Sequence, residues 1–440
     1  MIDHVFYPNL KHEYPVIVKG KGIYLWDTDG KKYVDACSGA LVSNIGHGVE
    51  EIRDAIFNQL KEVEFAHRFK FTNKPLQELA AKIVQMTPEG LNWVSFVSGG
   101  SEATESAMKL AREYFIEKGK PTKYKVISRW QSYHGNSLGA LSMSGNPGRR
   151  KRYAPLLVDF PHVSPAYCYR CPYDKHQDTC SLECALEIEK TILKEGPENV
   201  AAVILEPVVG SSLGAAVPKD GYMQKVREIC DTYDVLFIAD EVMTGVGRTG
   251  ENFAVDHWNV SPDIITLAKG LSGGYVPLGA MVVKDFIHET FKNGSGKFAH
   301  GFTYGGNPVA AAAGVAVLNY VEKHDLINNS KVMGKYLMEK LQELKEKYEF
   351  IGDVRGLGLM TGVEFVKDKE TKQPFEDSKA ITDKVVNTAL DKGLMLYAAG
   401  SCADGTKGDA VMIAPPLTVT KEEIDMIITL FEDVINTVIR

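Results

Sequence analysis

The chain has 440 residues, of which 44% are hydrophobic and 24% charged, and its formal net charge is −7. This composition is typical of a soluble globular protein, the length suggests two domains, and the acidic balance gives no sign of binding to nucleic acid or an anionic membrane. The first residues contain neither a basic nor an apolar segment, and no apolar stretch is long enough to span a bilayer. We therefore expect a cytoplasmic protein.

The first sixty residues combine strand and helix signals. Two strands are expected at residues 22–26 and 31–35, on either side of a turn that contains Gly30. A helix is expected at residues 50–62, where apolar residues recur at helical spacing. We expect residues 1–60 to join the smaller of the two domains.

The middle of the chain contains five short apolar runs, with helical or loop sequence between them. The runs are nearly continuous in apolar residues, which is typical of parallel strands that helices cover on both faces. They lie at residues 93–97, 124–128, 200–205, 235–239 and 263–268. The sequence therefore predicts a doubly wound α/β domain over residues 61–325, with a cysteine-rich insertion at residues 165–186.

The pattern changes after a buried helix expected at residues 308–320. Short strands and amphipathic or charged helices follow from there. The strands are expected at residues 358–365, 393–397 and 411–414, and the helices at residues 330–347, 377–392 and 421–439. This pattern predicts a second, smaller α+β domain over residues 326–440.

Polar residues follow each of the five apolar runs. In an open parallel sheet, ligands bind beyond the carboxyl ends of the strands, which is where these residues would lie. In chain order these residues are Gly100, Ser101, Tyr133, His134, Glu206, Asp240 and Lys269. Taken singly, each has an ordinary explanation, such as a helix-capping turn, a packed aromatic ring, a solvated carboxylate or a surface lysine. Together, in this order, they indicate one shared site.

Asp240 and Lys269 close two successive apolar runs, so we expect them at the ends of neighbouring strands. An amine and a carboxylate in these places suit a pyridine ring that bears an aldehyde. The amine forms a Schiff base with the aldehyde, and the carboxylate keeps the ring nitrogen protonated. Gly100 and Ser101 open a helix and can offer N–H groups to a phosphate, while Tyr133 can stack on a flat ring.

The motifs that contain these residues resemble those of the class III aminotransferases, the ω-aminotransferase group of fold-type I pyridoxal-phosphate enzymes. They read VSGGSEA at 97–103, SYHGN at 132–136, LEP at 205–207, IADEV at 238–242, TLAKG at 266–270 and FTYGGNP at 302–308. The resemblance extends from about residue 15 to the C-terminus. It implies a large domain with a mainly parallel sheet of the seven-stranded type, a smaller α+β domain, and pyridoxal 5′-phosphate (PLP) as cofactor. It also implies a homodimer with each active site at the subunit interface, and a tetramer is compatible with it.

The resemblance also implies a role for each site residue. Lys269 would carry the Schiff base and move a proton between the substrate carbon and the cofactor. Asp240 would pair with the ring nitrogen, Val242 and Tyr133 would pack on the two ring faces, and Glu206 would lie near the ring's 3-hydroxyl group.

Other residues would surround the cofactor phosphate and complete the site. Gly100 and Ser101 would bind the phosphate, joined by Thr303 of the partner subunit. His134 belongs to the cofactor-binding set through its SYHGN motif.

Two positions depart from the family pattern where substrate is bound. Members that act on 4-aminobutyrate carry a second glutamate five positions after the one in the Glu-Pro pair, where this chain has Ser211. They also carry an arginine for the α-carboxylate of the keto acid, at the position that an ungapped count assigns to Met412. Another cation would have to serve an oxo-acid acceptor. The candidates, chosen by charge and loop placement, are Arg149, Arg150, Arg152 and Lys407, and all are equally compatible with solvated basic loops.

Four of the seven cysteines cluster in the insertion, with the spacing C-x2-C-x8-C-x3-C. The residues are Cys168, Cys171, Cys180 and Cys184. Such pairs suit a tetrahedral zinc site, whereas the alternative is a packed insertion with reduced thiols. Without a secretory signal, a disulfide framework is disfavoured.

The sequence predicts a ping-pong transamination through Lys269. The amino group would come from an ω-amino acid or primary amine, of the taurine, β-alanine or 4-aminobutyrate type, and would pass to pyruvate or 2-oxoglutarate. One alternative is a PLP-dependent racemase or aminomutase of the same fold, which needs the same lysine and aspartate. A second is a non-catalytic binding protein held together by metal at the cysteine cluster, which would be colourless.

Overall fold

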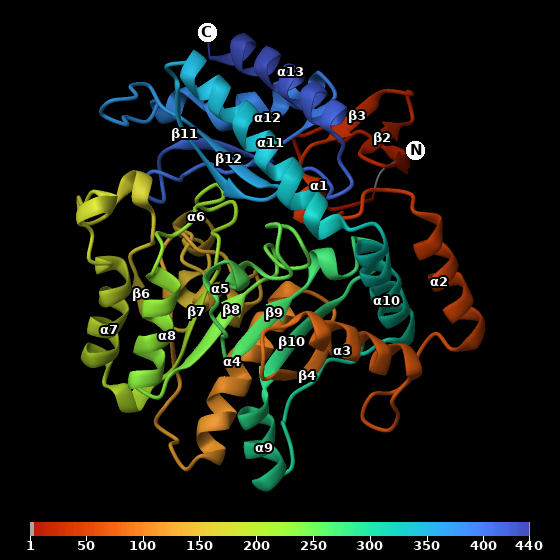
Figure 1. The fold of residues 1–440 in the computed structure, drawn as a ribbon, viewed down its shortest axis with the longest axis vertical. Helices are drawn as coiled ribbons and strands as arrows, with labels where there is room; N and C mark the ends of the chain where they lie inside the picture. The colour runs from red at the N-terminus through yellow and green to blue at the C-terminus, as the bar shows by residue number, and fades with distance from the viewer. Residues whose placement is uncertain (1–3, 440) are drawn as a thin grey trace.

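The computed structural model describes residues 4–439, and its centre is a seven-stranded sheet (Figure 1). In spatial order the strands are β4 (Leu91–Val97), β10 (Gly279–Lys284), β9 (Ile264–Leu267), β8 (Leu236–Asp240), β7 (Val200–Leu205), β5 (Lys125–Arg129) and β6 (His162–Val163). Strands β9, β8, β7, β5 and β6 pair in parallel, whereas β10 is antiparallel to both of its neighbours. All five predicted strands are therefore present and run in one direction, which confirms the predicted fold class. Strands β10 and β6 are additions to the prediction.

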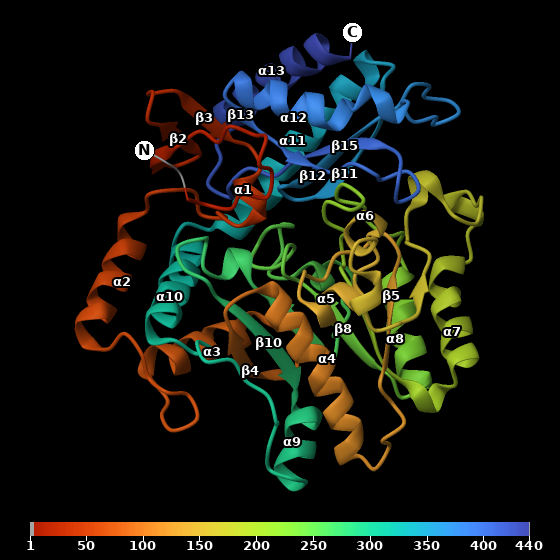
Figure 2. The same ribbon diagram turned by 180° about the vertical axis from the view of Figure 1, so that it is seen from behind.

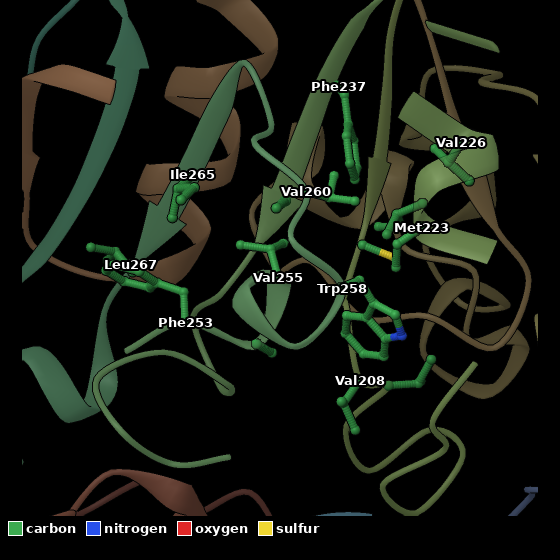
Figure 3. Close-up of a cluster of buried hydrophobic side chains, with 14 of the residues drawn as sticks. Val208, Met223, Val226, Phe237, Phe253, Val255, Trp258, Val260, Ile265 and Leu267 are labelled. Carbon is green, nitrogen blue, oxygen red and sulfur yellow. The ribbon is translucent and has the colours of Figure 1, made fainter. Parts of the chain in front are cut away.

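Helices cover both faces of this sheet. Successive strand residues point to opposite sides, so the apolar side chains of each strand need cover on both faces. Ile238 and Ile264 pack with helices α4 (Gly100–Glu117) and α9 (Asp285–Asn293) on one face. Phe237 and Ile265 pack on the other face, where helices α7 (Glu183–Glu195) and α8 (Tyr222–Thr232) contribute. Figure 3 shows Met223 and Val226 of α8 with Phe237, Trp258 and their apolar neighbours in this second layer.

The smaller domain contains two four-stranded sheets. One sheet has the order β1 (Ile17–Lys21), β2 (Tyr24–Asp27), β3 (Lys32–Asp35) and β13 (Leu394–Met395). The other has the order β11 (Ile351–Leu357), β12 (Met360–Phe365), β15 (Asp409–Ile413) and β14 (Tyr397–Ala398). Helices α11 (Leu326–Lys347), α12 (Ile381–Asp391) and α13 (Lys421–Val438) pack with these strands.

The N-terminal strands pair with a strand from the far end of the chain. Strand β3 pairs in parallel with β13, so the red N-terminal segment lies beside the blue C-terminal elements in Figure 2. This pairing places the N-terminal strands in the smaller domain, and the division at residues 1–60, 61–325 and 326–440 stays a prediction. The strand expected at residues 393–397 is two short strands, β13 and β14, because the chain passes from one sheet to the other at Leu396.

The remaining helices connect the two domains and flank the sheet. They are α1 (Ser38–Leu41), which is irregular, and α2 (Glu50–Glu62), α3 (Lys74–Met86), α5 (Leu138–Met143), α6 (Pro147–Arg150) and α10 (Pro308–Lys323). The predicted bounds of α2 are confirmed. Within residues 4–439, no helix has the length and apolar character needed to cross a membrane.

A buried carboxylate joins the cysteine-rich insertion to the smaller domain. Glu364 of β12 is fully buried and accepts a hydrogen bond of 2.7 Å from Arg170 Nε. Its other oxygen lies 3.0 Å from Arg355 Nη2 and accepts a hydrogen bond from the Tyr167 hydroxyl. Glu364 thus pairs with two arginines from different parts of the chain, and Arg355 also pairs with Asp353 at 3.0 Å.

We expect Glu364→Ala to destabilise the protein by about 3–5 kcal/mol, because it leaves the largely buried guanidinium of Arg170 without its counter-charge and leaves Arg355 with Asp353 alone. Urea unfolding followed by circular dichroism measures the change. Glu376→Ala is the control, since Glu376 forms an exposed ion pair with Lys367 and its loss should cost less than about 1 kcal/mol. Equal shifts in the two variants would contradict the assignment.

Candidate active site

The expected site residues meet at the carboxyl ends of the parallel strands, around one cavity. Asp240 ends β8 and lies opposite Thr266 of the neighbouring strand β9, and Lys269 follows β9. The cavity is lined by Gly100, Ser101, Tyr133, His134, Gly135, Glu206, Gly210, Ser211, Asp240, Val242, Met243 and Lys269. Among the residues expected to bind cofactor, Thr303 alone does not line it. The structure thus brings together groups that are up to 169 positions apart in the chain, from Gly100 to Lys269.

Lys269 is held in an unusual backbone conformation inside the cavity. Its φ is 43°, in the left-handed region that residues other than glycine rarely adopt. Burial lowers the pKa of its amine to about 8, although the nearby Asp240 and Glu206 carboxylates act in the opposite direction. A substantial fraction of the amine is therefore neutral, and nucleophilic, near physiological pH.

Three polar groups contact the carboxylate of Asp240, a residue that is only 4% exposed. Its Oδ2 atom lies 2.7 Å from His134 Nδ1. Its Oδ1 atom accepts hydrogen bonds from the Val242 backbone N–H at 3.1 Å and from the Thr266 hydroxyl at 3.3 Å. These contacts fix the orientation of the carboxylate. They also give His134 a positioning role that the sequence did not reveal.

Glu206 places a carboxylate oxygen, Oε2, at the cavity. The residue is 6% exposed, and burial raises the pKa of its carboxyl group. Its backbone carbonyl accepts a hydrogen bond of 2.6 Å from the buried Arg129, and its Oε1 atom accepts one from the Gly210 N–H. In the described part of the chain, Glu206 Oε2 has no hydrogen-bond partner, although Arg129 Nη2 lies 3.8 Å away in an ion pair with it. A polar atom of a bound ring would satisfy it.

The start of helix α4 provides an open group of backbone donors. A Cβ atom on Gly100 would lie 2.8 Å from Val242 Cγ1, so only glycine fits against this side chain. Gly135 has a φ of 130°, and a Cβ atom there would collide with the hydroxyl of Ser101. Gly99, the residue just before α4, makes no side-chain cap on the helix. The first N–H groups of α4 are thus suited to a phosphate.

The four cations that were expected to bind substrate lie in different environments. Arg149 is exposed, and its guanidinium carbon lies 4.6 Å from the centroid of the Tyr133 ring, which lines the cavity. Arg152 is exposed, and Lys407 borders a separate hollow in the smaller domain.

Arg150 makes hydrogen bonds to the backbone through one of its nitrogens. Its Nη1 atom donates to the carbonyl groups of Leu141, Ser142 and Ser144, at 2.8–3.0 Å. These carbonyls belong to the C-terminal end of α5, where backbone acceptors lack helical partners. The Nη1 atom is therefore bound by the backbone, and a role of Arg150 in binding substrate stays a prediction.

Thr303 lies in the loop before α10, and in its own chain it is exposed and away from the cavity. Its contribution from a partner subunit stays a prediction. Arg129, by contrast, was missed in the sequence. Arg129 stands at the end of an apolar strand, where a buried charge needs a partner, and this position could have identified it as a site residue.

The cysteine cluster gives the zinc hypothesis no support. All seven cysteines are free, and Cys184 lies in the first turn of α7. Across residues 4–439, no three His, Cys, Asp or Glu side chains are grouped so that they could hold a metal ion. The alternative, a packed insertion with reduced thiols, agrees with burial raising the pKa of Cys168 and, to about 12, that of Cys184.

Comparison with known proteins agrees with this geometry. The family model described as aminotransferase class-III matches residues 6–435. The chain is 43% identical over 438 residues to the uncharacterized aminotransferase YodT of Bacillus subtilis, covering 100% of this chain and 98% of the relative. It is 38% identical over 417 residues to the putrescine–pyruvate aminotransferase of Pseudomonas aeruginosa, covering 94% and 89%.

A solved structure matches over the same extent. The amine transaminase from an uncultivated Pseudomonas species, in a PLP-bound form, has a TM-score of 0.93 and 34% identity, covering 100% of this chain and 99% of that one. Fold and site together define a PLP-dependent transferase of fold type I. The protein belongs to the class III aminotransferase family.

The residues around the cavity fit PLP. The open N-terminus of α4 suits the phosphate, the Asp240 carboxylate suits a protonated ring nitrogen, and the Glu206 oxygen that accepts no hydrogen bond suits a ring hydroxyl.

The pKa of Lys269 leads to a measurable pH dependence. Only the neutral amine attacks an aldehyde, and its fraction rises as pH rises through the pKa. The rate at which cofactor-free protein takes up PLP should therefore increase with pH, with a midpoint near 8. Stopped-flow absorbance over a pH series measures it. A midpoint near 10.5, the ordinary value for lysine, would show that Lys269 is not desolvated.

Proposed function

We propose that this protein moves an amino group from a primary amine or ω-amino acid to pyruvate or 2-oxoglutarate, and that Lys269, Asp240 and Glu206 are its catalytic residues. The observation that carries the proposal is the arrangement of Lys269 and Asp240. An amine made partly neutral by burial and a carboxylate fixed by three partners lie at adjacent strand ends beside one cavity.

When bound, PLP supplies an electrophilic aldehyde and an electron-withdrawing ring. The chain then has four tasks. The backbone N–H groups of Gly100 and Ser101 would bind the phosphate, and the Asp240 carboxylate would accept a hydrogen bond from the ring nitrogen. The Nζ atom of Lys269 takes the proton from the substrate carbon that bears nitrogen and returns a proton later. Tyr133 and Val242, which line the cavity, would enclose the ring and exclude water.

The donor is best sought among primary amines. Met412 is buried in strand β15 and Ser211 is neutral, so neither offers a charge to a substrate carboxylate. Donors with a distal acid, such as taurine, β-alanine and 4-aminobutyrate, would need a cation from elsewhere. The putrescine–pyruvate relative supports a donor without an acid group and pyruvate as acceptor.

A screen of donors against both oxo acids tests the proposal. PLP-loaded protein is incubated with putrescine, β-alanine, taurine or 4-aminobutyrate and with pyruvate or 2-oxoglutarate, and the alanine or glutamate formed is measured. We expect amino-group transfer from at least one amine, and none without an oxo acid. Racemisation or isomerisation of an amino acid, without transfer to any oxo acid, would overturn the proposal.

A further inference from the structure

A buried arginine pairs with one of the cavity residues. Arg129 ends strand β5 and Glu206 follows strand β7, and the two strands pair in parallel, so both residues stand at adjacent strand ends. The side chain of Arg129 is 1% exposed and that of Glu206 is 8% exposed. Glu206 lines the cavity, whereas Arg129 does not. Any effect of Arg129 on the site must therefore pass through a neighbour such as Glu206.

Two contacts join Arg129 to Glu206, and one nitrogen makes both. Arg129 Nη2 donates a hydrogen bond of 2.6 Å to the Glu206 backbone carbonyl and lies 3.8 Å from Glu206 Oε2. The first contact holds the backbone at Glu206. The second places a positive charge beside the carboxylate oxygen that, within residues 4–439, accepts no hydrogen bond.

The charge of Arg129 needs this carboxylate. A guanidinium inside a protein is costly unless an opposite charge accompanies it. Within the part of the chain that the structure describes, Glu206 is the ion-pair partner of Arg129, and Arg129 Nε and Nη1 have no hydrogen-bond partner. Burial raises the pKa of the neighbouring Tyr222 to about 12, so its hydroxyl stays neutral. An ionised Glu206 is thus the counter-charge of Arg129.

Other charged or titratable groups also face the Glu206 carboxylate, and they come from different elements. Burial raises the pKa of Glu206, His134 and Arg129 lower it, and Asp240 raises it. Burial lowers the pKa of Lys269, whereas the Glu206 carboxylate acts to raise it. Of the groups that favour the ionised form of Glu206, Arg129 is the one whose charge does not titrate in the physiological range.

We propose that Arg129 is a positioning residue, which keeps Glu206 ionised and turned toward the cavity so that Oε2 acts there as a hydrogen-bond acceptor. The inference deepens the proposed function and rests on it for the role of Glu206. An acceptor at this place suits a ring hydroxyl, which donates, whereas a protonated Glu206 would present a donor. The same charge favours the protonated amine of Lys269, so the pH dependence of PLP uptake reports on it.

The test measures PLP uptake by cofactor-free protein over a pH series, by stopped-flow absorbance. Without Arg129, Glu206 should take up a proton and lose the charge that raises the pKa of Lys269. In Arg129→Met the midpoint should therefore fall below 8 by about one pH unit. Arg129→Lys, which keeps the positive charge, should stay near the wild type. Arg129→Gln keeps an N–H donor for the Glu206 carbonyl, should shift as Arg129→Met does, and replaces that variant if it does not fold.

A double-variant cycle tests whether the effect passes through Glu206. Glu206→Gln should lower the midpoint as Arg129→Met does, and the two changes together should equal Glu206→Gln alone. Arg227→Met is the matched control, because Arg227 is a largely buried arginine that pairs with Asp263 and Asp231 and does not line the cavity. Its midpoint should match that of the wild type.

Two outcomes would overturn the inference. An unchanged or higher midpoint in Arg129→Met would show that Glu206 keeps its charge without Arg129. Additive shifts in the double variant would show that Arg129 does not act through Glu206. If the wild type transferred no amino group to either oxo acid, the proposed function would fail, and the uptake midpoints would still decide the role of Arg129.

Discussion

Lys269→Ala should lower the rate of amino-group transfer by about 10⁴-fold or more, because it removes both the nucleophile and the group that moves the proton. The cavity and its other cofactor contacts remain, so the variant should still hold PLP but without the visible absorbance of the lysine-bound form. Steady-state turnover with the best amine donor and absorbance spectra of the purified protein measure the two effects.

Lys292→Ala serves as the comparison, since Lys292 is an exposed lysine on α9. It should keep wild-type turnover and colour. Wild-type turnover in Lys269→Ala would show that the assignment of the catalytic lysine is wrong.

Asp240→Asn should lower kcat by about 10³-fold with little change in folding, because the neutral amide cannot stabilise a positive charge on the ring nitrogen. Asp240 also raises the pKa of Lys269, so the variant should shift the pH midpoint of PLP uptake below 8. Turnover at saturating cofactor and the stopped-flow pH series test the two parts separately.

Asp231→Asn is a suitable control, because Asp231 is an exposed partner of Arg227 far along α8. A wild-type kcat in Asp240→Asn would mean that the ring nitrogen has another partner. A normal pH midpoint with a reduced kcat would mean that Asp240 acts on the ring without influencing the lysine.

The parallel part of the fold could be predicted because its strands are buried on both faces. The runs that became β7 and β8 are continuously apolar, and no other common element explains such short runs. Strand β10 was missed because it follows a glycine-rich loop. Its reversed direction depends on its place between β4 and β9, which is a property of the whole sheet. The split of residues 393–397 between two sheets is likewise a tertiary property.

The site could be predicted as far as chain order reveals it. Polar residues at strand ends were sufficient to find Lys269 and Asp240, since parallel strands bring their carboxyl ends together. The contact between His134 and Asp240 joins residues 106 positions apart, and no local pattern encodes it. The role of Arg150 was hidden for a different reason, because its partners are backbone carbonyls, which every residue has.

The pairing of β3 with β13 has a consequence for how the protein is made. Residues 34 and 394 lie in register, so roughly 360 residues must leave the ribosome before the N-terminal strands find their neighbour. During that interval one edge of β3 has its backbone groups unpaired, which favours association with other nascent chains. The large domain can complete its sheet earlier, because every strand of that sheet lies before residue 285. We therefore expect yield in a heterologous host to depend on chaperones that shield the early strands until translation is nearly finished.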